Sequence, residues 1–167
     1  LSPLHSLVRN HTVTSDDLAH LESLWVEGEN RVDDGYTAPL PGRVTEYTLK
    51  AARKREFDRT ISHYMQPHTP YFSSSKEYNE LSDLETHPHS YKKEKVWDAY
   101  LDNLRFVLDD VEVLLENIDG SVVITADHGE LMGEMGINDH PVGHIHPKLR
   151  KVPWIRTMGS DQRTKIP

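Results

Sequence analysis

The residues best suited to chemistry lie at the end of one short apolar run. Residues 121–126 are mostly apolar or β-branched, and Asp127, His128 and Gly129 follow at once. A carboxylate beside an imidazole can bind Zn²⁺ or Mn²⁺, and a carboxylate alone also accepts Ca²⁺ or Mg²⁺. Neighbouring side chains of a strand point to opposite faces, so the chain must turn for both groups to converge, and Gly129 permits that turn. The stretch predicts a divalent-metal site.

Such a site needs further ligands, and three more histidines follow closely, His140, His144 and His146. All three are near enough in sequence to return on a loop, and Glu130 could orient His128 through a hydrogen bond. Metal binding would require neutral imidazoles and should weaken below a pH of roughly 6. The alternative is that Asp127 caps a helix beginning near Gly129, which would leave the histidines on a polar loop.

A second candidate is His68, which lies between Pro67 and Pro70 in a stiff loop. The preceding residues 57–65 are read as a strand, and loops just past strand ends often carry ligand contacts in α/β proteins. A purely structural turn is the equal alternative. The other acid or histidine pairs, at 33–34 and 87–89, are interpreted as solvated loops.

Helices and strands alternate around these groups. Apolar residues recur every three or four positions through residues 92–118, which predicts a long amphipathic helix. A second helix is expected from a cap at Thr45 to about residue 55. Residues 57–65, the helix 92–118 and the strand 121–126 would form a β-α-β unit with a parallel sheet, and 151–157 would add a last strand. Residues 121–126 should be covered on both faces.

Composition narrows the classes of function. The 167 residues carry a formal charge of −8, which argues against nucleic acid and anionic membranes as partners because both require a basic surface. There is no cysteine, so disulfides, thiolate metal sites and a cysteine nucleophile are excluded. The sequence has no apolar run long enough for a membrane span and no visible signal peptide, and a cytoplasmic location is expected.

Two stretches carry a resemblance to a known family. Residues 122–134, Val-Val-Ile-Thr-Ala-Asp-His-Gly-Glu-Leu-Met-Gly-Glu, and 149–155, Leu-Arg-Lys-Val-Pro-Trp-Ile, resemble the C-terminal half of the alkaline-phosphatase/sulfatase superfamily, most closely the sulfatase-like hydrolases of haloarchaea. Residues 61–71, Ile-Ser-His-Tyr-Met-Gln-Pro-His-Thr-Pro-Tyr, are similar to that family's Pro-His-x-Pro-Tyr/Phe segment, which lies by the substrate's anionic group. With the long helix, the resemblance covers roughly residues 44–157.

The resemblance implies a fold and a set of roles. It implies a partial alkaline-phosphatase-like α/β sandwich, a mostly parallel sheet flanked by helices, forming one partial domain over residues 1–167. Asp127 and His128 would be metal ligands, His140 the best further ligand with His146 and His144 behind it, and His68 would contact sulfate or phosphate oxygens. The substrate would be a small anionic ester. A half-sheet with open edges is also expected to self-associate.

The family's nucleophile is not found in this sequence. In sulfatases it is a modified Cys or Ser in a Cys/Ser-x-Pro-x-Arg motif, and Ser2-Pro3 is too short a fragment to count. The chain is therefore expected to be the later part of a metal-dependent sulfate or phosphate ester hydrolase, inactive alone. A phosphotransferase or phosphomutase of the same superfamily, or a non-catalytic relative that keeps the fold for binding, are the alternatives.

Overall fold

The computed structural model describes residues 17–24, 38–54, 57–69, 71–72 and 92–165. In these ranges the chain has a mixed α/β content. Its helices are α2 (Pro41–Lys54), α3 (Lys93–Leu115) and the short 3₁₀ helix η3 (Pro147–Arg150). Its strands are β1 (Gly120–Thr125), β2 (Leu131–Glu134), β3 (Ile137–Asp139) and β4 (Trp154–Gly159).

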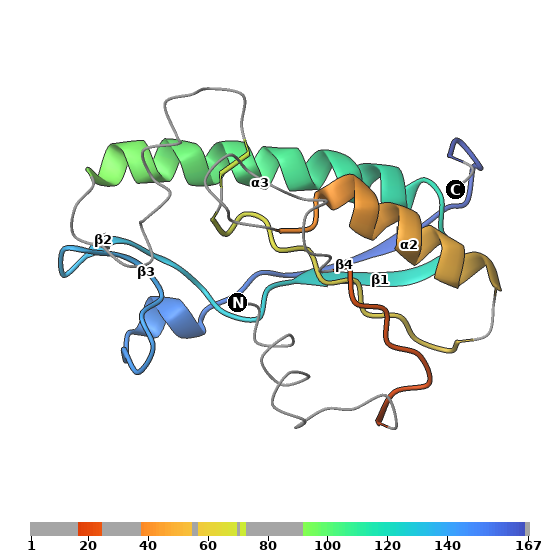
Figure 1. The fold of residues 1–167 in the computed structure, drawn as a ribbon, viewed down its shortest axis with the longest axis horizontal. Helices are drawn as coiled ribbons and strands as arrows, with labels where there is room; N and C mark the ends of the chain where they lie inside the picture. The colour runs from red at the N-terminus through yellow and green to blue at the C-terminus, as the bar shows by residue number, and fades with distance from the viewer. Residues whose placement is uncertain (1–16, 25–37, 55–56, 70, 73–91, 166–167) are drawn as a thin grey trace.

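Helix α3 runs along the long axis of the molecule, and the other described elements lie beside it (Figure 1). The apolar stripe predicted it, and the helix is confirmed. Its buried positions are three, four or seven residues apart, which places them on one face: Val96, Ala99, Asn103, Val107 and Leu114. The helix ends slightly before the predicted limit, and Gly120 turns into β1 with a φ of 112°.

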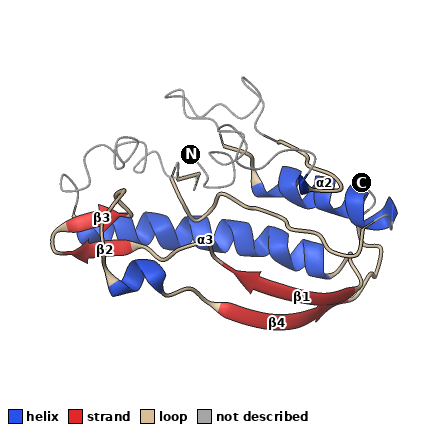
Figure 2. Cartoon of the chain, turned by 90° about the horizontal axis from the view of Figure 1, so that it is seen from below, coloured by secondary structure: helices blue, strands red, loops and turns tan. Residues whose placement is uncertain are grey.

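Helix α2 packs on the C-terminal part of α3 (Figure 2). Its buried residues include Val44 and Leu49. The predicted helix is present, but it begins at Pro41, because proline suits a first turn. Thr45 is therefore not the cap. It lies inside the helix, fully buried, with its hydroxyl 2.9 Å from the Tyr64 hydroxyl.

The sheets differ from the prediction. Strand β1 pairs antiparallel with β4, from Gly120 opposite Gly159 to Thr125 opposite Trp154, and β2 pairs antiparallel with β3. The expected parallel sandwich was wrong for the described residues. The strands expected at 121–126 and 151–157 exist with shifted limits, as β1 and β4.

No strand forms at residues 57–65, so β1 has no parallel partner there. Side chains of this extended segment instead bond to α2, where Ser62 Oγ lies 2.8 Å from Thr48 Oγ1. Burial was also overestimated, because positions along β1 are exposed or half-buried and none is fully buried. An apolar run predicts a strand, but it does not specify the direction of its neighbour or what covers it.

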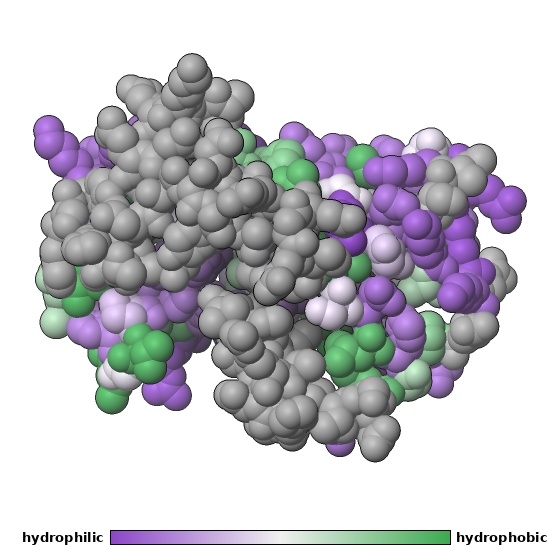
Figure 3. All heavy atoms as spheres, in the orientation of Figure 1, coloured by the Kyte–Doolittle hydropathy of each residue, from purple (hydrophilic) through white to green (hydrophobic). Residues whose placement is uncertain are grey.

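Hydrophobic side chains remain on the described surface. Two of them, Val142 and Ile145, are exposed on the loop that leads into η3, where Figure 3 shows hydrophobic surface. Others lie on the β1–β4 sheet, including Trp154 and Met158. Among the described residues, no helix combines the length and apolar character that crossing a membrane requires.

Several predictions fall outside the described residues. These are the acid pair at 33–34, the helix expected near 76–84 and the histidines at 87 and 89. The helix expected to carry Leu18, Leu21 and Leu24 is described only in part, and residues 18–24 are not helical.

Candidate metal centre

Three segments meet beside the N-terminal half of α3. They are the loop that carries His68, the turn after β1 that carries His128, and the end of β3 that carries Asp139 and His140. The imidazole rings of His68 and His140 are 5.0 Å apart between centroids, and those of His128 and His140 are 4.0 Å apart. The fold therefore places His140 between two histidines from distant parts of the sequence.

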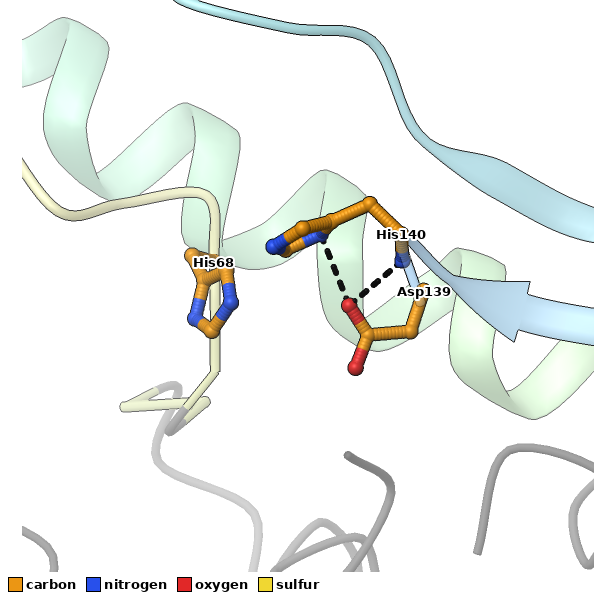
Figure 4. Close-up of side chains that lie close together, drawn as sticks. All are labelled: His68, Asp139 and His140. Carbon is orange, nitrogen blue, oxygen red and sulfur yellow. Dashed lines mark hydrogen bonds and ion pairs between the residues drawn. The ribbon is translucent and has the colours of Figure 1, made fainter. Parts of the chain in front are cut away.

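Carboxylates complete this cluster. Glu130 Oε1 lies 3.0 Å from His140 Nδ1, and Asp139 Oδ1 lies 2.7 Å from the same nitrogen. Figure 4 shows His68 facing His140, with the Asp139 carboxylate bonded to the backbone and ring nitrogens of His140. Two overlapping groups could each hold a metal ion, His68 with Asp139 and His140, and His128 with Glu130 and His140. Imidazole with carboxylate is a donor set that fits Zn²⁺ or Mn²⁺.

The hydrogen bonds determine which ring nitrogen carries the lone pair. His68 Nδ1 lies 2.7 Å from the Thr69 carbonyl oxygen, and His128 Nδ1 lies 3.0 Å from the Gly129 carbonyl oxygen. A carbonyl oxygen can only accept, so both Nδ1 atoms donate and the lone pair is on Nε2. His140 Nδ1 is held by carboxylates in the same way. Metal-binding histidines typically have this arrangement, with one nitrogen on an oxygen acceptor and the other on the ion.

The charge of the cluster favours a cation. Burial alone would lower the pKa of His140, but hydrogen bonds to Asp139 and Glu130 raise it to about 10. Burial would raise the pKa of Asp139, but its contacts with His140 lower it. Tyr71, which lines a small pocket here with His68, has a raised pKa because it is buried and faces the same carboxylates. The formal charges of the two carboxylates outnumber that of one protonated imidazole, so the cluster is net negative.

The backbone is constrained at both ends of the cluster. Asp139 has a φ of 86°, a left-handed conformation that is uncommon for a residue other than glycine. Helix η3 crosses the chain at Gly129, just after the end of β1. Gly129 N donates to the Leu149 carbonyl of η3 over 2.9 Å. A Cβ atom at Gly129 would overlap the Lys148 carbonyl oxygen. Strained and tightly crossed backbone of this kind is often found at functional sites.

The other predicted ligands are placed less centrally. Asp127 is exposed and belongs to neither group, but its Oδ1 lies 3.7 Å from His128 Nε2. Two ligand atoms on the same ion, each bonded at about 2.1 Å, are roughly 3.0–3.4 Å apart. The distance between Asp127 and His128 is therefore slightly too wide for a shared ion as the side chains stand. Asp127 does not cap a helix, because the chain continues from Gly129 into β2.

His146 and His144 are not part of the cluster. His146 Nδ1 accepts a hydrogen bond from Lys148 N and caps η3, so its proton arrangement is opposite to that of the three clustered histidines. His144 is on the same loop and is absent from both groups of candidate ligands among the described residues.

Two acids in the cluster were not assigned correctly by sequence reasoning. Glu130 was expected to orient His128, but it bonds to His140. Asp139 was not singled out at all. Its position directly before His140 was the available signal, because an acid next to a candidate ligand can hold that ligand's second nitrogen.

Comparisons of the chain with models of known protein families, with curated proteins and with solved structures found no match.

Proposed function

We propose that this chain forms one wall of the active site of a metal-dependent hydrolase of sulfate or phosphate esters. The observation that supports it best is the shared arrangement of His68, His128 and His140, each with Nδ1 on an oxygen acceptor. Nε2 is therefore the nitrogen that each ring would offer to an ion, His140 after losing its second proton, which is the arrangement expected of metal ligands.

The proposed roles follow from position. His128 and His140 would hold the ion, with Asp127 beside His128. Glu130 and Asp139 would keep the proton of His140 on Nδ1 and make Nε2 a stronger donor. His68, on the opposite loop, would reach the sulfate or phosphate group through the ion, because a lone pair on Nε2 can bind a metal but cannot donate to an anion. A divalent ion at this place would supply charge stabilisation for the ester oxygens.

The negative charge of the cluster gives the proposal a specific consequence. Carboxylates of Glu130 and Asp139 would repel an anionic ester, so the anion should bind only when a cation lies between them. The chain has no cysteine and no Cys/Ser-x-Pro-x-Arg motif. The proposal therefore assigns no residue to the nucleophile.

Anion binding with and without metal tests the function. Inorganic sulfate and phosphate are titrated calorimetrically into the protein, first alone and then with saturating Mn²⁺. We expect binding only with Mn²⁺, with the preferred anion indicating the ester class. His68→Ala should weaken it at least about tenfold, because the ion that binds the anion loses a ligand, whereas His63→Ala in the same segment should not. Metal binding without any anion binding would instead favour a non-catalytic binding protein.

A further inference from the structure

We infer that Asn103 of α3 is a positioning residue that sets the orientation of His68, an inference that rests on the proposed metal-dependent site. Asn103 is fully buried on the face of α3 that otherwise buries apolar side chains such as Val96, Ala99 and Val107. A buried amide is costly unless its hydrogen bonds are made, so this position needs a reason beyond filling space.

The hydrogen bonds of Asn103 supply that reason. Its Nδ2 donates to the His68 carbonyl over 2.9 Å and, more weakly, to the Pro67 carbonyl over 3.4 Å. Its Oδ1 accepts from Phe72 N over 2.9 Å. One side chain therefore bonds to the backbone on both sides of Thr69.

This clamp acts on the atom that orients the imidazole. The Thr69 carbonyl holds His68 Nδ1 at 2.7 Å and so determines that Nε2 carries the lone pair. Asn103 bonds to the peptide group that joins His68 to Thr69. The Thr69 carbonyl belongs to the next peptide group along the chain. Holding the carbonyl of His68 and the amide of Phe72 restrains the short segment between them and so limits the directions that the Thr69 carbonyl can take.

The chain contains a matched control in Asn117, which follows α3. It is also almost fully buried, and its Nδ2 donates to Val113 O and Thr164 Oγ1 over 2.8 and 2.7 Å. Its Oδ1 accepts from Lys165 N over 2.7 Å. Asn117 therefore makes three comparable bonds, but to the C-terminal segment and not to the His68 loop.

The experiment compares Asn103→Leu and Asn103→Asp with Asn117→Leu and Asn117→Asp in the whole chain. Long-range ¹H–¹⁵N spectra of the metal-free protein, recorded at a pH of about 8, report the tautomer of each ring. The His68 signals are identified by their loss in His68→Gln. Mn²⁺ affinity is measured separately by calorimetry. Asn103→Asp keeps the acceptor for Phe72 N and replaces the donor with a carboxylate oxygen, so it decides the question if the leucine variant does not fold.

We expect His68 in the wild type to carry its proton on Nδ1. Both Asn103 variants should shift it toward the Nε2-protonated form and weaken Mn²⁺ binding about 10- to 100-fold. Asn117 variants should lower the melting temperature similarly while leaving the His68 tautomer and the Mn²⁺ affinity unchanged. A folded Asn103→Asp protein with the wild-type tautomer would overturn the inference. Absent Mn²⁺ binding in the wild type would contradict the proposed function, while the tautomer would still test the role of Asn103.

Discussion

At the scale of residues, the ring nitrogens separate candidate ligands from histidines with other roles. His128 and His140 both direct Nδ1 to an oxygen acceptor, whereas His146 uses Nδ1 to accept from Lys148 N. The first arrangement leaves Nε2 for an ion, and the second uses the lone pair in a helix cap. Side-chain chemistry alone could not make this distinction, because all the histidines have the same two nitrogens.

Glu130→Gln tests the carboxylate that supports His140. Glutamine keeps the size of the side chain but removes the charge, so His140 Nε2 becomes a weaker donor. We expect Mn²⁺ affinity to fall about 10- to 100-fold by calorimetry. Glu134→Gln is the control, because Glu134 pairs with Lys148 outside the cluster. Equal losses in the two variants would argue that general charge, and not the bond to His140, attracts the ion.

The protonation of His140 predicts a dependence of stability on pH. The pKa of His140 is raised from 6.5 to about 10 in the folded protein. A raised pKa stabilises the folded state fully below the unfolded value, and this contribution is lost as pH rises through the folded value. We therefore expect the His140 contribution to the free energy of unfolding of the metal-free protein to decrease steadily between pH values of about 7 and 9.

Urea unfolding at several pH values measures that slope. His140→Gln should be flatter than the wild type over this range, because the titrating group is gone. Tyr64 and Tyr100 do not titrate in this pH range, because burial raises their pKa values to about 12. A slope that is the same in both proteins would show that His140 is not protonated in the folded state at neutral pH.

At the scale of elements, the end of β1 is held by a close backbone crossing. Gly129 N bonds to the Leu149 carbonyl, and η3 lies directly over the glycine. The preceding β1 pairs with β4, which follows η3. The crossing therefore fixes His128 relative to the segment that joins β3 to β4.

Gly129→Ala should break this crossing. The added methyl group would overlap the Lys148 carbonyl oxygen and lie 2.8 Å from that of Lys151, so backbone must move. We expect a loss of about 1–3 kcal/mol or more in the free energy of unfolding, measured with urea. Gly42→Ala is the control. There the methyl group would be 3.5 Å from the nearest Asp110 oxygen, and a helical alanine should stabilise the protein by roughly 0.5–1 kcal/mol.

The elements themselves were predictable to different degrees. Helix α3 was found from its apolar spacing, which is a local property of the chain. Strands β1 and β4 were also found, but their antiparallel pairing was not, because pairing direction depends on contacts between distant residues. The hairpin of β2 and β3 was missed, since four- and three-residue strands leave little periodicity to detect.

The candidate site shows the same division. His68, His128 and His140 were selected by residue type and by neighbouring proline, glycine or strand signals. Their meeting follows from the packing of the hairpin and the His68 loop beside α3, which no local pattern encodes. Asn103 was not identified, because one asparagine within a helix is not by itself a signal of function.

At the scale of the whole molecule, the β1–β4 sheet leaves apolar side chains in solvent. Trp154 and Met158 of β4 are 68% and 66% exposed, and they share a face with Val123 of β1. Exposed apolar groups on a sheet favour association between chains. This surface supports the expectation that the protein self-associates.

Trp154→Ser tests that expectation. Size-exclusion chromatography with light scattering over a range of concentrations should show association of the wild type and a shift toward monomer in the variant. Val142→Ser provides the control, because Val142 is exposed on a loop outside the sheet. A wild-type protein that stays monomeric at every concentration and melts cooperatively would contradict it.

The central claim is that the histidine cluster binds a divalent ion, and calorimetric titration of the metal-free protein with Mn²⁺ and Zn²⁺ tests it most directly. We predict saturable binding in the wild type that His140→Ala abolishes and that His144→Ala, on the neighbouring loop, leaves unchanged. Each binding event should release protons, since the ion must replace the proton on His140. No saturable binding, or equal binding in the two variants, would contradict the claim.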